Sequence, residues 1–308
     1  MKAETDNDKT ITVSNRRLQL TNLNKIFWPE EKITKGDVID YYNTVGKYIL
    51  PYLKGRPESL KRNPNGISDK GFFHKDAGED APEWIDTKEI YAESTEQNVN
   101  YILCNNKPTL LYLANLGCIE LNPWNSRIEK LDYPDYLIMD IDPSEKNNFD
   151  DVIEVALAIK DILDRAKAAS FCKTSGASGI HVYVPLAARY PYEQVRAFAE
   201  LLAGMAHGQI PGLSTMERSL KKRGKDKVYI DYLQNSRGQT LACAYSLRPR
   251  PGATVSTPLK WSEIKKGLRP DGFNIHTIPK RITREGDLFA GVLKKGIDLE
   301  KCLPLLEN

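Results

Sequence analysis

A short stretch near the middle of the chain decides the fold: Tyr136-Leu137-Ile138-Met139-Asp140-Ile141-Asp142-Pro143. Its apolar residues predict a buried β-strand over residues 135–142 that ends at the proline. Because side chains alternate along a strand, Asp140 and Asp142 lie on one face and the apolar side chains on the other. Two carboxylates on one face repel each other, and magnesium or manganese, which prefer oxygen ligands, would relieve that repulsion. Two exposed aspartates before a turn would give the same pattern.

The segments that follow alternate between helices and strands. Periodic apolar residues predict helices over residues 151–165 and 192–206, and apolar runs predict strands over residues 180–185 and 228–233. Together with the first strand, this β-α-β-α-β order is typical of an α/β core.

Two further segments frame this core. Thr34 and Asp37 form a capping-box pattern, and the apolar spacing after them predicts a helix over residues 35–49. Residues 248–285 are rich in proline, lysine and arginine, and we expect them to wrap the outside of the molecule.

A loop rich in glycine and hydroxyl residues precedes the strand predicted over residues 180–185. It reads Lys173-Thr174-Ser175-Gly176-Ala177-Ser178-Gly179-Ile180-His181, and such a loop can offer backbone N–H groups to phosphate oxygens. His181 then lies on the strand that the loop opens. The loop matches neither a Walker loop nor a Rossmann fingerprint, so a tight surface turn with a packed histidine is the alternative.

A third carboxylate, Asp231, interrupts the strand pattern of Val228-Tyr229-Ile230-Asp231-Tyr232. By itself it would be an ordinary residue at a strand end or in a turn. If the three strands lie in one sheet, Asp231 would meet Asp140, Asp142 and the glycine loop at one surface of that sheet. Two metal ions about 3.5–4 Å apart, bridged by such carboxylates, would clamp the attacking and leaving oxygens of a phosphoryl transfer.

Composition excludes several other classes of protein. The chain has 308 residues, 41% of them hydrophobic and 28% charged, which is ordinary for a globular protein. It has no apolar run of about 18 residues and no apolar segment near its start, so we expect neither a membrane span nor a secretory signal. Its five cysteines form no Cys-x-x-Cys pair, which argues against a zinc ribbon and a disulfide scaffold and favours a reducing cytoplasm.

In the residues quoted so far, the sequence resembles the polymerase domain of bacterial DNA ligase D, within the archaeo-eukaryotic primase superfamily. The resemblance runs from about Leu20 to Asp287 and includes Tyr245-Ser246-Leu247-Arg248. It implies an α/β (α+β) primase-polymerase fold, in which a mixed central sheet carries the catalytic carboxylates and helices flank it. It also implies a template-dependent nucleotidyltransferase that adds nucleotides, often ribonucleotides, to DNA 3′ ends and fills gaps during non-homologous end joining.

The resemblance assigns roles to residues one by one. The ligands of two Mn²⁺ or Mg²⁺ ions would be Asp140, Asp142 and Asp231. The incoming rNTP or dNTP would be bound by Lys61, Asn122, Ser175, Gly176, His181 and Arg248. A DNA 5′-phosphate would be bound by Asn22, Lys25 and Lys35, and template bases would contact Phe72 and Phe73. Without the resemblance, the lysines would be a solvated face and the two phenylalanines a core pair.

Two departures from the family pattern bear on the nucleotide site. The family usually has histidine where this chain reads Leu121-Asn122-Pro123-Trp124, and asparagine can form hydrogen bonds but cannot become cationic. Many members also have lysine where the glycine loop carries Ser178. Lys222 and Arg223 both approximate a further basic residue of the family. The three carboxylates remain, so we expect activity.

The resemblance also implies an organisation and partners. We expect a flexible N-terminus over residues 1–10, a single catalytic domain over residues 11–290 and a C-terminal tail over residues 291–308. Within the domain, residues 11–125 would form a DNA-end-binding subregion and residues 126–290 the catalytic core. The implied partners are DNA ends or gaps with a 5′-phosphate, a DNA ligase domain and a Ku-type end-binding protein. The implied location is the cytoplasm, at the nucleoid.

Two other functions compete with this one. A primase would start chains without a primer, because the superfamily includes primases. A non-catalytic module would bind DNA ends through the 5′-phosphate alone, if the departures weaken the nucleotide contacts.

Overall fold

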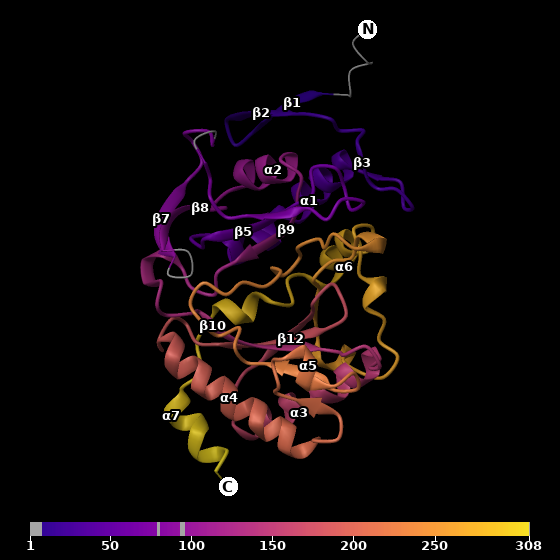
Figure 1. Ribbon diagram of the computed structural model, residues 1–308. Helices are drawn as coiled ribbons and strands as arrows, with labels where there is room; N and C mark the ends of the chain where they lie inside the picture. Colours follow the sequence, from indigo (N-terminus) through magenta and orange to yellow (C-terminus); the bar gives the residue numbers. More distant parts are fainter. Residues whose placement is uncertain (1–7, 79–80, 93–95, 308) are drawn as a thin grey trace. The chain divides into compact units, whose positions relative to one another are not determined.

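The computed structural model describes residues 8–78, 81–92 and 96–307. The chain divides into two compact units (Figure 1). Unit 1 takes the chain up to Trp124 together with Ala242–Ser256 and Asp271–Gly286, and unit 2 takes Asn125–Leu241, Thr257–Pro270 and the chain from Asp287 onward. Of the predicted flexible N-terminus, the first seven residues lie outside the described residues, whereas Lys9 and Thr10 belong to the first strand.

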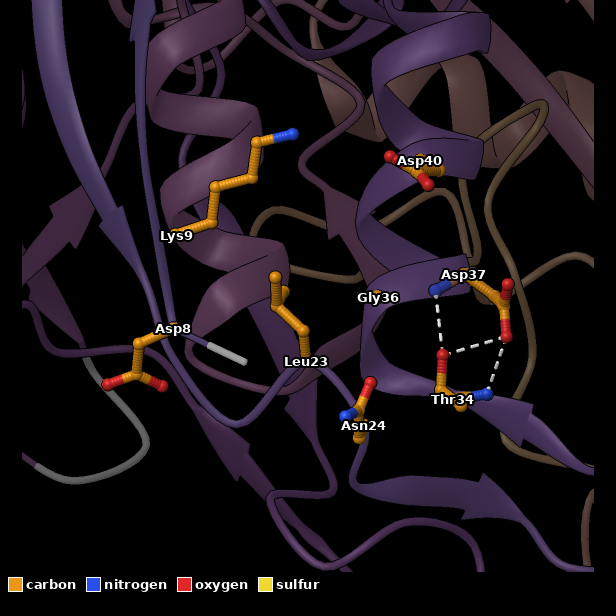
Figure 2. Close-up of a pocket in the computed structure, with 8 residues that line it drawn as sticks. All are labelled: Asp8, Lys9, Leu23, Asn24, Thr34, Gly36, Asp37 and Asp40. Carbon is orange, nitrogen blue, oxygen red and sulfur yellow. Dashed lines mark hydrogen bonds between the residues drawn. The ribbon is translucent and has the colours of Figure 1, made fainter. Parts of the chain in front are cut away.

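The long helix of unit 1, α1 (Lys35–Leu53), begins at the predicted capping box. The Thr34 hydroxyl accepts the backbone N–H of Asp37 at 3.1 Å, and the Asp37 carboxylate accepts the backbone N–H of Thr34 at 2.7 Å (Figure 2). Its apolar stripe is buried, and the helix α2 (Lys107–Asn115) packs beside it. The helix predicted over residues 35–49 is therefore confirmed and runs one turn further.

Unit 1 also holds a three-stranded sheet in which β5 lies between β6 and β9. All of its pairings are antiparallel, and they place Lys61 opposite both Phe73 and Glu120. Three two-stranded ribbons, β1–β2, β3–β4 and β7–β8, complete the strands of this unit. The bounds are β1 (Lys9–Val13), β2 (Arg16–Leu20), β3 (Ile26–Trp28), β4 (Ile33–Thr34), β5 (Glu58–Arg62), β6 (Phe72–His74), β7 (Thr87–Ala92), β8 (Gln97–Ile102) and β9 (Cys118–Pro123).

Unit 2 is built on a six-stranded mixed sheet with the order β13-β14-β10-β12-β11-β15. Neighbouring strands are antiparallel except for β13 and β14, which are parallel. The bounds are β10 (Tyr136–Asp142), β11 (Phe171–Thr174), β12 (Ile180–Pro185), β13 (Ser214–Thr215), β14 (Val228–Asp231) and β15 (Pro258–Leu259). The three predicted strands are thus β10, β12 and β14, and the mixed central sheet is confirmed.

Two helices pack side by side against this sheet, α3 (Phe149–Arg165) and α4 (Tyr192–Gln209) (Figure 1). They confirm the helices predicted over residues 151–165 and 192–206. Apolar side chains on α3, on α4 and on the face of β10 opposite the aspartates are fully buried: Leu137, Met139, Ile141, Val152, Val155, Ile159, Ile162, Val195 and Leu202. Burying each such side chain contributes about 1.5–3 kcal/mol, so this layer fixes the sheet that carries the aspartates.

The expectation that residues 248–285 wrap the outside is wrong for much of that segment. Ala253, Val255 and Leu259 are buried, and Ile278 and Ile282 of α6 (Ile278–Glu285) are buried as well. Apolar residues are scattered between the prolines and cations of this segment, and these are the residues that are buried. The overall composition of the segment did not indicate them.

The remaining helical elements are short. They are η1 (Ile128–Lys130), α5 (Leu220–Arg223), η2 (Pro251–Ala253), η3 (Trp261–Glu263), η4 (Pro270–Gly272), α6 (Ile278–Glu285), η5 (Ala290–Leu293), α7 (Leu299–Cys302) and η6 (Leu303–Leu305). Across the part of the chain that the structure describes, no helix is both long enough and apolar enough to cross a membrane.

Candidate active site

The register of the unit 2 sheet brings the predicted carboxylates together. Asp140 on β10 lies directly opposite Asp231 on β14. Opposed residues of an antiparallel pair point to the same face with Cβ atoms about 4.5–5.5 Å apart. Asp142 lies two residues further along β10 and therefore shares that face. Asp140 is buried and the other two are half-buried, so all three carboxylates are partly withdrawn from water.

Mutual repulsion marks these carboxylates as a site that favours a cation. Burial and then the charge of Asp140 raise the pKa of Asp142 to about 6, and the same two causes raise the pKa of Asp231. Hydrogen bonds from Leu233 N–H and Gln234 Nε2 to the Asp231 carboxylate, at 2.8 and 3.3 Å, act in the opposite direction. The raised pKa values of Asp142 and Asp231, caused by burial and by the neighbouring Asp140, fit a site that gains from a divalent cation.

The case for a metal ion rests on the types of donor atom and not on a ready-made cluster of ligands. In residues 8–78, 81–92 and 96–307, no three His, Cys, Asp or Glu side chains form a ready-made set of metal ligands. What fits is the chemistry of the donors, since Asp140, Asp142 and Asp231 supply the hard oxygens that Mg²⁺ and Mn²⁺ prefer.

The glycine and hydroxyl loop joins β11 to β12 beside these carboxylates. The Ser175 hydroxyl accepts the backbone N–H groups of Ala177 and Gly179 at 3.1 and 3.0 Å, which closes the turn. A Cβ on Gly179 would lie 2.4 Å from the carbonyl oxygen of Ile141 and 2.9 Å from an Asp142 carboxylate oxygen. Glycine is therefore required there, because the loop backbone passes directly over the end of β10.

His181 connects the loop strand to the carboxylates. Its Nε2 lies 3.1 Å from Asp140 Oδ1, and its Nδ1 lies 2.8 Å from Lys173 Nζ. All three residues are at most 5% exposed. The sequence pattern contains Lys173 but does not distinguish it, because a lysine beside a loop is usually solvated.

The predicted nucleotide contacts Lys61, Asn122 and Arg248 belong to unit 1. Arg248 Nε forms an ion pair with Glu120 at 2.8 Å, and the register of β5 and β9 puts Glu120 opposite Lys61. Asn122, two residues along β9 from Glu120, is buried and donates to the carbonyl of Ser59 at 3.0 Å. Asn122 thus has a hydrogen-bond partner within its own sheet. Nothing in the sequence indicated the ion pair between Arg248 and Glu120.

Phe72 and Phe73 form an exposed pair instead of a core pair. Phe72 is 47% exposed and Phe73 is 59% exposed. Arg62 lies over the Phe72 ring at 5.4 Å and Lys61 over the Phe73 ring at 4.9 Å. Exposed aromatic rings flanked by cations suit stacking against nucleic-acid bases, so the template contact stays a prediction with a favourable geometry.

The three residues predicted to bind a DNA 5′-phosphate line one hollow of about 250 Å³ in unit 1. Asn22, Lys25 and Lys35 share it with Arg62 and Asn115. Lys35 is 5% exposed and donates to the carbonyl of Thr21 at 2.6 Å. Burial and then the nearby charge of Lys25 lower the pKa of Lys35 to about 8. Burying Lys35 beside Lys25 costs free energy because the two cations repel each other and lose hydration. A bound anion would offset that cost.

The start of α1 does not supply free backbone donors to such an anion. The N–H groups of Lys35 and Gly36 donate to the carbonyls of Lys25 and Leu23, and that of Asp37 donates to Thr34. Local turns therefore use these N–H groups, and an anion bound near Lys35 would not receive them. A second hollow at this helix start is lined by Asp8, Asp37 and Asp40 and by the single cation Lys9, which does not suit phosphate (Figure 2).

Comparison with known proteins identifies the family of the chain. The family model for the LigD primase-polymerase domain matches residues 34–289. The chain belongs to the LigD primase-polymerase family. It is 36% identical over 271 residues to the bifunctional non-homologous end joining protein LigD of Bacillus subtilis, covering 88% of this chain and 43% of that protein. It is 32% identical to a multifunctional LigD protein of Mycobacterium tuberculosis, covering 90% of this chain and 37% of that protein.

A solved structure extends the comparison to three dimensions. The polymerase domain of Mycobacterium tuberculosis ligase D in complex with DNA matches with a TM-score of 0.84 and 29% sequence identity, covering 91% of this chain and 99% of that one. As a LigD primase-polymerase domain, the chain is a nucleotidyltransferase of the polymerase class and uses a divalent metal. It spans less than half the length of the curated LigD proteins that it matches.

Proposed function

We propose that this LigD primase-polymerase domain adds nucleotides to DNA 3′ ends and fills gaps during non-homologous end joining. The observation that carries the proposal is the register that sets Asp140 opposite Asp231, with Asp142 on the same polar face of the sheet. The family model and the names of the LigD relatives, which refer to non-homologous end joining, support it.

In the proposed mechanism, Asp140, Asp142 and Asp231 would hold two divalent ions, Mn²⁺ or Mg²⁺. Such ions, when bound, lower the pKa of a primer 3′-hydroxyl and stabilise the leaving pyrophosphate. The protein residues position the reactants: the Ser175–Gly179 loop and His181 of unit 2 would contact the triphosphate. The predicted contribution of positive charge by Lys61 and Arg248, both of unit 1, rests on the family resemblance. Catalysis then arises from positioning and charge stabilisation without a covalent enzyme intermediate.

DNA would be held through its 5′-phosphate and its template bases. Lys25 and Lys35 supply two cations in one small hollow, and Asn22 lines the same hollow. The exposed rings of Phe72 and Phe73 supply stacking surfaces worth about 1–3 kcal/mol per base. The solved structure that this chain resembles is a complex with DNA, which supports DNA as the ligand.

The length of the LigD relatives bears on the partners. Because they are bifunctional or multifunctional proteins more than twice as long as the matched region, we propose that this domain acts with a DNA ligase domain. The same proposal includes a Ku-type protein as the partner that holds the broken ends. It also locates the reaction at the nucleoid, in the cytoplasm.

The experiment that tests the proposal is extension of a 5′-phosphorylated, single-nucleotide-gapped DNA with Mn²⁺, comparing rNTPs with dNTPs. We expect templated addition that stops in excess chelator and falls at least about 100-fold in Asp140→Ala, while binding to the same DNA persists. Tight DNA binding without addition would replace the proposal with the end-binding module. Addition on a template without a primer would instead establish a primase.

A further inference from the structure

Four polar residues form one transverse row across the sheet of unit 2. Lys173 on β11 is opposite His181 on β12, His181 is opposite Asp140 on β10, and Asp140 is opposite Asp231 on β14. Residues directly opposed across antiparallel strands share a face, so the row runs continuously from a lysine to the carboxylates. The proposed function uses the last three members of this row and leaves Lys173 without a role.

Lys173 is too deeply buried to bind substrate itself. It is 0% exposed, and its Nζ contacts His181 Nδ1 at 2.8 Å and faces the ring of Tyr183 at 5.7 Å. A fully buried lysine costs free energy unless polar groups compensate for its lost hydration. Because Lys173 is buried at that cost and contacts a histidine of the site, we expect it to act through that histidine.

The contacts of His181 determine which ring nitrogen carries the proton. With Lys173 as an ammonium, which has three donors and no acceptor, Nδ1 of His181 accepts from it with its lone pair across the 2.8 Å contact. The proton of the ring is then on Nε2, 3.1 Å from Asp140 Oδ1. The opposite tautomer would set an N–H against the ammonium and a lone pair against the carboxylate, and both contacts would be repulsive.

We propose that Lys173 is a positioning residue that keeps the His181 proton on Nε2, so that the ring always presents a donor to the anionic side of the site. That N–H lies 3.1 Å from Asp140 Oδ1, and in the proposed polymerase function it is the group that a phosphate oxygen of the nucleotide would meet. The first half of the inference concerns only the folded chain, and the second half rests on the proposed function.

The direct test is a long-range ¹⁵N–¹H correlation spectrum of the histidine rings. The chain has only four histidines, His74, His181, His207 and His276, so the ring signals are few. His181→Gln identifies the His181 pattern by its loss. We expect wild-type His181 to carry its proton on Nε2 with Nδ1 unprotonated, and a His181 that carries its proton on Nδ1 would overturn the inference.

Variants of Lys173 then test the cause. Lys173→Met has a similar length and no donor, Lys173→Arg keeps donors, and Lys301→Met removes an exposed lysine of unit 2 as a control. In Lys173→Met we expect a mixture of His181 tautomers and a rise in the KM for nucleotide of about 10-fold, with Lys173→Arg closer to the wild type. An unchanged His181 pattern in a folded Lys173→Met would overturn the inference.

The outcomes separate this inference from the proposed function. If Lys173→Met does not fold, the wild-type spectrum and Lys173→Arg still decide the tautomer. If the Nε2 tautomer is found but no variant, including the wild type, extends DNA, the polymerase proposal fails while the assignment of Lys173 stands. If extension is normal and the His181 proton is on Nδ1, the role assigned to Lys173 fails while the polymerase proposal stands.

Discussion

At the scale of single residues, Lys35 combines burial with a neighbouring cation. Its pKa, lowered to about 8, means that it is charged at pH 7 and mostly neutral at pH 9. Above pH 8, binding a 5′-phosphate must therefore include uptake of a proton by Lys35.

We accordingly predict that the preference for 5′-phosphorylated over 5′-hydroxyl DNA falls between pH 8 and pH 9 by up to about tenfold. The measurement is the ratio of the two dissociation constants by fluorescence anisotropy from pH 7 to pH 9. Lys35→Arg, which keeps its charge throughout this range, should flatten the profile. A wild-type ratio that does not change with pH would show that Lys35 does not bind the phosphate.

Residue identities predicted which face Asp140 and Asp142 share, but not which side chains lie beside them. The alternation around Asp140 and Asp142 was visible in the sequence, because a strand of period two places them on one face. The contacts of Lys173 and Glu120 were not, because Lys173 meets a histidine on the next strand, eight residues away, and Glu120 meets Arg248, 128 residues away and outside the named strands. The first of these pairings follows from sheet register and the second from the path of a long connection, and one sequence reveals neither.

At the scale of elements, the loop between β11 and β12 depends on Gly179. A methyl group at this position would collide with the backbone of β10, and backbone cannot move away as a flexible side chain can. We predict that Gly179→Ala lowers the free energy of unfolding by about 1–3 kcal/mol and reduces extension, because the loop and Asp142 are displaced together.

Gly204→Ala is the matched control for that substitution. Gly204 lies inside α4, and a Cβ there would meet nothing within 4 Å. Since alanine is the better helix former, we expect this variant to be more stable than the wild type by up to about 1 kcal/mol. Urea unfolding of both variants decides the matter, and a Gly179→Ala protein as stable as Gly204→Ala would contradict the close approach.

Elements with strong periodicity were predicted close to their observed bounds, and weakly patterned ones were missed. The strand predicted over residues 180–185 is β12 itself, and α3 begins two residues before its prediction. β11 (Phe171–Thr174) escaped prediction because four residues carry too little pattern, and β15 is a two-residue strand that contains a proline. The antiparallel order of the sheet was also beyond reach, since it depends on how connections cross between strands.

At the scale of the whole molecule, one buried carboxyl should tie stability to pH. Glu58 is fully buried in unit 1, neither of its carboxylate oxygens has a hydrogen-bond partner among the described residues, and burial raises its pKa well above its usual value despite nearby Arg56. A raised pKa in the folded state means that the folded protein retains a proton that the unfolded chain has lost. Stability from this group is therefore complete below about pH 4.5 and is lost as pH rises.

We predict that Glu58→Gln removes this loss. From pH 5 upward, the wild type should lose up to about 1.4 kcal/mol per pH unit relative to Glu58→Gln, until the folded-state pKa is reached. Urea unfolding at pH 5, 6, 7 and 8 measures the difference. Parallel curves for the two proteins would show that Glu58 is ionised in the folded state.

The charge of the whole chain says little about DNA binding, since 44 basic and 41 acidic residues nearly cancel. What matters is local, as in the hollow that holds Lys25 and Lys35. We predict that the DNA affinity falls steeply with salt, because each neutralised phosphate releases counterions, and that Lys25→Gln reduces the slope of log K against log salt by about one. An affinity independent of salt would contradict binding through phosphates.

The central claim is that the carboxylate face of β10 and β14 performs the chemistry. Asp231→Asn tests it most directly, because asparagine keeps the shape of the side chain and an oxygen that can accept the Leu233 N–H. On 5′-phosphorylated gapped DNA with Mn²⁺, we predict a loss of extension of at least about 100-fold with DNA affinity within about twofold of the wild type. Extension by Asp231→Asn at the wild-type rate would contradict the claim and move the catalytic centre elsewhere in the chain.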